Sequence, residues 1–206
     1  MRSLKHIISW LLVCIISTIC YLSANAQIIS GSYDDGLTLA FNAKTNRVTG
    51  YFAISTGFDE STGKSKFSCV FYLSGFYNNN GFAIKSYDPL DNKDNSIVGE
   101  IQIKDSITIS IKLVQEPGGC WNVQHFSNGF VDFKLATKTN WFEISYINID
   151  KAYFYRDRNE ASKRKAYVVK GDIVYIDQIE DEWIHCKYYG KSATEGWIKK
   201  ELINKY

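Results

Sequence analysis

Residues 97–113 read IVGEIQIKDSITISIKL, two alternating runs joined by the polar turn Lys104-Asp105-Ser106. In both runs the odd positions carry Ile, Leu or Gly, whereas most even positions carry a polar or charged side chain. Successive side chains of a β-strand point to opposite faces, so a period of two indicates strands with one buried face. The stretch therefore predicts an antiparallel hairpin that packs on an apolar core.

The same alternation recurs on both sides of this hairpin, and no part of the chain after residue 26 has sustained helical periodicity. We therefore predict an all-β fold in which residues 27–150 form an antiparallel meander barrel of about eight strands, because closure removes exposed edges. A two-sheet sandwich is the alternative architecture. The other predicted inward faces are Leu37, Leu39 and Phe41; Val48, Gly50, Phe52 and Ile54; Cys69, Phe71 and Leu73; Phe82 and Ile84; Val131, Phe133 and Leu135; and Phe142 and Ile144.

The composition is that of a globular protein with little net charge. The 206 residues are 45% hydrophobic and 15% aromatic, and 24 Lys and Arg face 22 Asp and Glu. This balance argues against a nucleic-acid partner, which selects for a strongly basic surface. Only three histidines occur, which disfavours most zinc sites and most histidine-dependent catalysis. We predict no cofactor.

The first 26 residues have the three parts of a secretory signal peptide. Arg2 and Lys5 form a basic start, residues 7–22 are almost wholly apolar, and Ala24-Asn25-Ala26 is a small-x-small cleavage site. The apolar core of about 16 residues is slightly short for a membrane span, so an uncleaved anchor is the weaker interpretation. We expect a periplasmic or secreted mature protein that starts at Gln27, with no membrane span after cleavage.

Three cysteines remain after cleavage, namely Cys69, Cys120 and Cys186. An exported protein meets an oxidising compartment, so two of the three are expected to pair. We predict a Cys69–Cys120 disulfide, with Cys186 reduced and buried; unpaired thiols and a catalytic cysteine are the alternatives. His185 precedes Cys186 on a predicted strand, so the two side chains point to opposite faces and cannot form a catalytic dyad there.

The charge pattern changes near Asp150. Residues 27–150 hold 10 basic and 13 acidic side chains, whereas residues 151–206 hold 12 basic and 9 acidic ones. We place a domain boundary at this point. No linker rich in Pro, Gly or Ser separates the halves, so we expect two closely coupled units.

Residues 151–206 contain an ordered set of short apolar and aromatic motifs: Ala152-Tyr153-Phe154-Tyr155, Lys170-Gly171-Asp172, Trp183-Ile184-His185-Cys186-Lys187-Tyr188, Gly196-Trp197-Ile198 and Leu202. This set resembles a bacterial SH3-like (SH3b) domain. The resemblance implies a small SH3-like barrel that binds peptidoglycan stem peptides or a protein of the cell envelope. Separately, Gly31-Ser32-Tyr33 and Thr49-Gly50-Tyr51 are similar to the opening of avidin-like and lipocalin-like barrels.

The C-terminal unit has more aromatic side chains than a core of its size can bury. We expect some of them to line an exposed groove, the usual place for gripping sugars or extended peptides. Trp197 follows Gly196 and is assigned to packing. Two simpler interpretations stay open, in which Trp183 belongs to the core and the basic run from residue 156 is a solvated loop. The predicted binding residues are Tyr153, Tyr155, Trp183, Tyr188, Arg156 and Arg158.

The sequence favours a non-enzymatic binding protein of the cell envelope, with peptidoglycan or an envelope protein as partner. The alternative is an inhibitor or immunity-type protein that blocks a wall-degrading or toxic enzyme. A small-ligand carrier ranks third. An enzyme ranks last, because the acidic clusters lie in turns, where carboxylates are normally solvated. We predict no catalytic residue and no metal ligand; Asp91–Asn95 lacks the spaced ligands and terminal Glu of a calcium loop.

Overall fold

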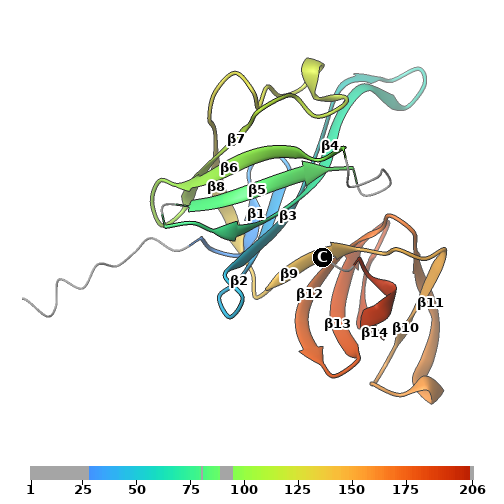
Figure 1. Ribbon diagram of the computed structural model, residues 1–206. Helices are drawn as coiled ribbons and strands as arrows, with labels where there is room; N and C mark the ends of the chain where they lie inside the picture. The colour runs from blue at the N-terminus through green and yellow to red at the C-terminus, as the bar shows by residue number, and fades with distance from the viewer. Residues whose placement is uncertain (1–27, 80, 89–94, 205–206) are drawn as a thin grey trace, which may run out of the picture.

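The computed structural model describes residues 28–79, 81–88 and 95–204, and it confirms the all-β class (Figure 1). The predicted signal peptide lies outside the described residues. Regular structure in the described ranges consists of strands and single-turn 3-10 helices. The barrel strands are β1 (Gly31–Tyr33), β2 (Leu37–Asn42), β3 (Arg47–Asp59), β4 (Lys64–Tyr77), β5 (Gly81–Tyr87), β6 (Ile97–Ile103), β7 (Thr108–Leu113) and β8 (Val131–Lys138).

The first eight strands form the closed antiparallel barrel that the alternation predicted. Each strand pairs with the next along the chain, and β8 returns to β1 through the pairs Gly31↔Lys138 and Ser32↔Thr137. The meander is therefore closed, and the two-sheet sandwich is wrong. Closure leaves the barrel without an unpaired edge strand, the usual weak point of a β-sheet.

Aromatic rings fill the interior of the barrel. Phe52 lies at the centre of the cluster, with its ring centroid 5.2 Å from that of Phe71, 5.1 Å from Phe126 and 6.0 Å from Phe133. All four side chains are buried. Such rings dominate core energetics because each buries a large apolar area. The lumen that a small-ligand carrier needs is thus occupied by side chains.

One disulfide, Cys69–Cys120, pins the loop after β7 to strand β4, as predicted. Cys120 begins the 3-10 helix η2 (Cys120–Asn122) and is fully buried, as is Cys69. The bond closes a loop of 51 residues, which in the chain-entropy model stabilises the fold by roughly 4 kcal/mol. Cys186 is free and buried, which confirms its predicted state.

The last alternating run before Asp150 leaves the barrel. It forms β9 (Glu143–Tyr146), which pairs with β12 (Ile173–Glu180) through Ile144↔Tyr175, while the short strand β1 takes its place in closing the barrel. The second sheet therefore uses residues on both sides of Asp150. Its strand order is β11-β10-β14-β13-β12-β9. The remaining elements are β10 (Lys151–Tyr155), η3 (Glu160–Ser162), β11 (Lys163–Val169), β13 (Trp183–Tyr189), β14 (Ala193–Lys199) and η4 (Lys200–Leu202).

The second sheet curls around its own small core. Strands β12, β13 and β14 form a meander, η4 follows directly, and Ile203 then bridges back to Ile147. Gly171, in the turn before β12, has a φ of +88°, a backbone conformation that side chains disfavour. The buried core residues are Ile147, Ala152, Phe154, Val168, Val174, Ile176, Ile184, Cys186, Ile198 and Ile203.

Strand β9 joins the two units, and the barrel binds its outer edge. The Ile144 N–H donates to Thr49 Oγ1 at 2.7 Å, and the Tyr72 hydroxyl donates to the Ile144 carbonyl at 2.6 Å. Both contacts are buried. Around them a third apolar cluster seals the joint with residues from both units: Ala40, Tyr72, Tyr87, Trp141, Ile144, Tyr146 and Tyr175.

Removal of the Tyr72 hydroxyl should weaken this joint. We expect Tyr72→Phe to lower the free energy of unfolding by about 1–3 kcal/mol, because a buried carbonyl loses a donor. Urea titration followed by tryptophan fluorescence measures the change. Tyr77→Phe is the matched control, since the exposed Tyr77 hydroxyl donates to Asn79 and its loss should cost less than about 0.5 kcal/mol. Equal effects of the two changes would contradict the proposed importance of the joint.

Candidate functional site

The predicted groove is only partly formed. Tyr155 and Trp183 lie together as expected, with ring centroids 4.9 Å apart, but each is only 8% exposed. Their predicted exposure is therefore wrong. The Lys199 ammonium lies 4.2 Å from the centroid of the Trp183 ring, and the Tyr155 hydroxyl donates to Glu160 at 3.0 Å. Neighbouring side chains cover most of both rings, so only a small part of each is left at the surface.

The sequence assigned Trp197 to packing, but the structure leaves this tryptophan only half-buried at the surface of the second sheet. It lies opposite His185 in the β13–β14 register, with the two ring centroids 5.3 Å apart. Gly196 and Ile198, its neighbours on β14, are buried. Alternation along β14 thus turns Trp197 outward, where Arg158 lies 5.5 Å from the ring centroid.

The other predicted residues divide between two faces. Tyr153 is half-buried on β10, with its ring centroid 5.9 Å from that of Tyr167. Tyr188 packs partly against the core of the second sheet, and its hydroxyl donates to Asp172 at 3.3 Å. Tyr188 therefore lies apart from the predicted groove.

Lysine and arginine side chains cover the rings of the second sheet. Lys163 lies 3.8 Å from the Tyr153 centroid, and Lys151 lies 3.7 Å from that of Tyr167. Together with the contacts of Lys199 and Arg158, these pairs define what we call the cation–aromatic face. Each such contact contributes about 0.5–1 kcal/mol at an exposed site. The arrangement holds positive charge beside flat apolar surface, which suits a ligand that has both carboxylates and apolar groups.

A hollow of about 760 Å³ opens beside Trp197, and we call it the Arg158 hollow. Arg158 lines it and forms an ion pair with Glu180 on β12. Arg156, two residues earlier, lines a smaller recess with His185 and Glu195. The residues that line the Arg158 hollow are Asp157, Arg158, Asn159, Asp181, Glu182, Trp183 and Trp197.

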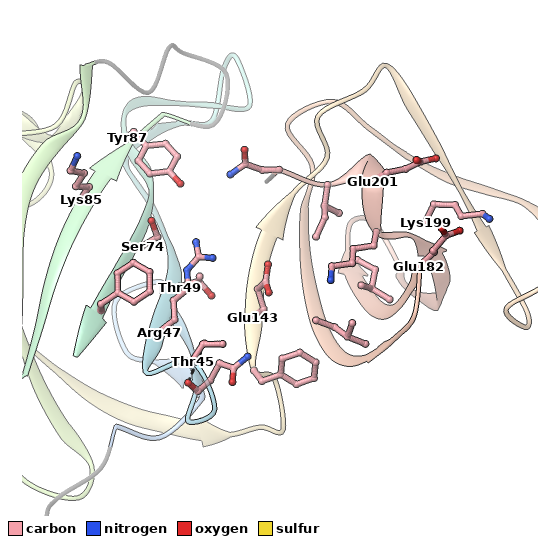
Figure 2. Close-up of a pocket in the computed structure, with 18 of the residues that line it drawn as sticks. Thr45, Arg47, Thr49, Ser74, Lys85, Tyr87, Glu143, Glu182, Lys199 and Glu201 are labelled. Atoms are coloured by element: carbon pink, nitrogen blue, oxygen red, sulfur yellow. Dashed lines mark hydrogen bonds between the residues drawn. The ribbon is translucent and has the colours of Figure 1, made fainter. Parts of the chain in front are cut away.

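A larger cleft of about 1000 Å³ separates the outer wall of the barrel from the second sheet. On the barrel side, Thr49, Ser74 and Lys85 are aligned across β3, β4 and β5 by the strand register. Figure 2 shows this row across the cleft from Glu143, with Glu182, Lys199 and Glu201 on the far wall, their charged ends directed away from the barrel. Positively and negatively charged side chains therefore line the same cavity. Sequence patterns gave no signal for it, because its walls come from strands far apart in the chain.

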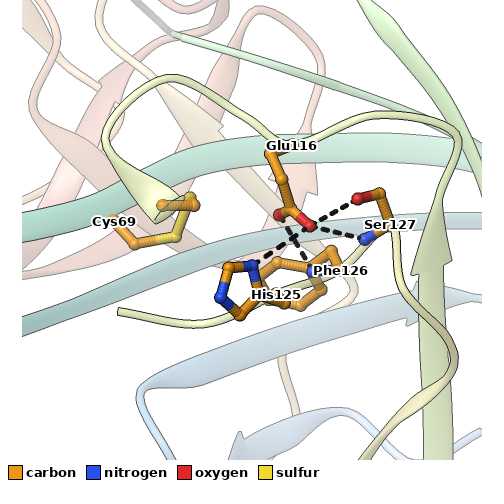
Figure 3. Close-up of polar contacts among 6 residues, drawn as sticks. Cys69, Glu116, His125, Phe126 and Ser127 are labelled. Atoms are coloured by element: carbon orange, nitrogen blue, oxygen red, sulfur yellow. Dashed lines mark hydrogen bonds and ion pairs between the residues drawn. A yellow bond between two sulfur atoms is a disulfide. The ribbon is translucent and has the colours of Figure 1, made fainter. Parts of the chain in front are cut away.

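A buried carboxylate organises the loop beside the disulfide (Figure 3). Glu116 accepts hydrogen bonds from the Phe126 N–H at 2.9 Å and from the Ser127 N–H and hydroxyl at 2.8 and 2.6 Å. Burial raises the pKa of Glu116, but these hydrogen bonds and nearby His125 outweigh it and bring the pKa below its ordinary value. The Ser127 hydroxyl donates to the carboxylate rather than to an imidazole, so these residues form a loop clamp and not a serine–histidine pair.

This clamp predicts an acid-sensitive contribution to stability. Because the folded-state pKa is lowered, the contribution is complete above the ordinary pKa of 4.5 and is lost as pH falls through the folded value. We expect Glu116→Gln to cost about 2 kcal/mol at pH 7 and much less at pH 3. Urea unfolding at both pH values measures this. Glu100→Gln, at an exposed position on β6, should show no such pH dependence, and the same profile for both variants would contradict the clamp.

The described thiols offer no accessible nucleophile. Cys69 and Cys120 are bonded to each other, and burial raises the pKa of the Cys186 thiol far above its usual value. His185 lies 2.7 Å from Asp177 Oδ1, whereas Cys186 faces the core. Within residues 28–79, 81–88 and 95–204, no group of three His, Cys, Asp or Glu side chains is placed to hold a metal ion.

In the same ranges no helix is long and apolar enough to cross a membrane. No protein-family model matches the sequence, and no curated protein matches it.

Proposed function

We propose that this chain is an exported, non-enzymatic binding protein of the cell envelope, and that its second sheet is an SH3b-like unit that binds peptidoglycan stem peptides. The strand order supports the SH3b-like assignment. A three-stranded meander, β12 to β14, is followed by the one-turn helix η4 and by a return to the start of the unit through Ile203↔Ile147. The Cys69–Cys120 bond supports a periplasmic or secreted location, since disulfides persist in oxidising compartments.

The observation that carries the proposal is the Arg158 hollow within the cation–aromatic face. Arg158 lies over the Trp197 ring and is paired with Glu180, so a ligand carboxylate reaches the guanidinium by replacing Glu180, while the ring offers a flat apolar contact. Stem peptides are extended chains with free carboxylates and small apolar side chains. An exposed aromatic surface with fixed cations complements both of these properties.

Co-sedimentation with purified peptidoglycan sacculi tests this function. We expect the full mature chain to sediment with sacculi at moderate salt, and Arg158→Ala to weaken binding roughly tenfold through the lost charge-assisted contact. Lys191→Ala is the control, because it removes one positive charge from the turn at the opposite end of β13. Failure of the wild type to sediment would overturn the proposal, as would equal binding by the two variants.

Two exposed aromatic side chains favour inhibition of a wall-degrading enzyme as the second candidate function. Phe58, on the part of β3 that extends beyond the barrel, is 67% exposed, and Trp121, on η2 beside the disulfide, is 64% exposed. A pinned loop with an exposed tryptophan binds a cleft at little entropic cost, and tryptophans often dominate protein interfaces.

A muramidase assay separates the two functions. Inhibition predicts that the mature chain slows sacculus digestion by a purified muramidase, and that Trp121→Ala abolishes this effect without changing co-sedimentation. Phe130→Ala, at another exposed barrel aromatic, is the control. Undiminished digestion in the presence of excess protein would remove muramidase inhibition from consideration.

A further inference from the structure

The cleft between the barrel and the second sheet contains a buried donor that the described chain does not use. Asn204 is 7% exposed and lines this cleft, and its backbone N–H donates to the Tyr146 carbonyl at 2.9 Å. Its side-chain Nδ2 has no hydrogen-bond partner among the described residues. A buried amide without an acceptor is costly, and such groups are rare in folded proteins. An acceptor supplied by a ligand would satisfy it.

The two walls of the cleft differ in net charge. Arg47 and Lys85 come from the barrel, whereas on the second sheet four acidic side chains outnumber two lysines: Glu143, Asp181, Glu182 and Glu201 against Lys199 and Lys200. Lys85 lies opposite Ser74 in the register of β4 and β5, so both side chains belong to the barrel wall of the cleft. A ligand that has a carboxylate at one point and an amine at another matches this division of charge.

The cleft and the Arg158 hollow share part of their lining. Asp181 and Glu182, at the turn between β12 and β13, line both cavities. Lys199 lines the cleft and also covers the ring of Trp183, which is part of the hollow. A chain that leaves the Arg158 hollow therefore has to pass only this turn to enter the cleft.

We propose that the cleft is a second subsite for the stem peptide, reached over the Asp181–Glu182 turn. A peptide carbonyl accepts the hydrogen bond of Asn204 Nδ2, a carboxylate lies against Lys85, and the free amine lies against Glu182 and Glu201. This inference rests on the proposed function, since it assigns a second part of the same ligand. It makes recognition bipartite, with one part of the site on the second sheet and the other in the cleft between the two units.

Isothermal titration of the full mature chain with purified disaccharide-tetrapeptide muropeptides tests the subsite. We expect Asn204→Ala to weaken binding about fivefold and Lys85→Ala by a similar factor, in line with the loss of one hydrogen bond or one partly exposed ion pair. Asn204→Ala should leave the melting temperature unchanged or raise it, because it removes a donor without a partner. Lys138→Ala, on β8 of the barrel, is the control and should bind as the wild type does.

The outcomes separate the subsite from the proposed function. Binding by Asn204→Ala and Lys85→Ala at wild-type affinity, with loss only in Arg158→Ala, overturns the subsite and leaves the function intact. Absence of binding by the wild type overturns both. A fall in melting temperature for Asn204→Ala together with normal binding by Lys85→Ala would show that Asn204 is structural. Acetylation of the muropeptide amine should also weaken wild-type binding several-fold, and no change would contradict the role of the acidic wall.

Discussion

Both backbone groups of Ile144 are hydrogen-bonded by buried barrel side chains, the hydroxyls of Thr49 and Tyr72. Ile144 belongs to β9, the edge strand of the second sheet. An edge strand exposes unpaired N–H and C=O groups, which invite pairing with other chains. Here the barrel satisfies them, so the same contact protects the edge and joins the two units. This joint holds the second sheet, with its cation–aromatic face, against the barrel.

The joint also explains why a cleft of about 1000 Å³ lies between the units. The barrel interior is filled by phenylalanine rings around Phe52, and the second sheet has a small apolar core of its own. Tyrosines and Trp141 seal one end of the contact between the units. Next to this apolar contact lies the cleft between the two units, and the polar side chains Ser74, Lys85 and Glu201 are among its lining. Binding at a junction between units is common, because two rigid walls form a concave surface there.

Alternation in the sequence predicted the barrel because period two directly reports which side chains face a core. Leu37, Phe52 and Ile111 are buried on the predicted face. Alternation does not identify the strands with which a given strand pairs, so it could not show that β9 pairs with β12. It also failed to distinguish Trp183 from Trp197, because exposure there depends on cover by Lys199 and on the register of β13 against β14. The inter-unit cleft depends on topology alone and leaves no local pattern.

The two units form one body through β9, and hydrogen exchange at a single amide tests this most directly. The Ile144 N–H donates across the joint to Thr49 Oγ1, so its exchange reports on opening of this contact. We predict that it exchanges as slowly as core amides of the barrel, such as that of Phe71, and only through global unfolding. Exchange of the Ile144 amide orders of magnitude faster than that of Phe71 under native conditions would contradict the account, because the units would then separate without unfolding.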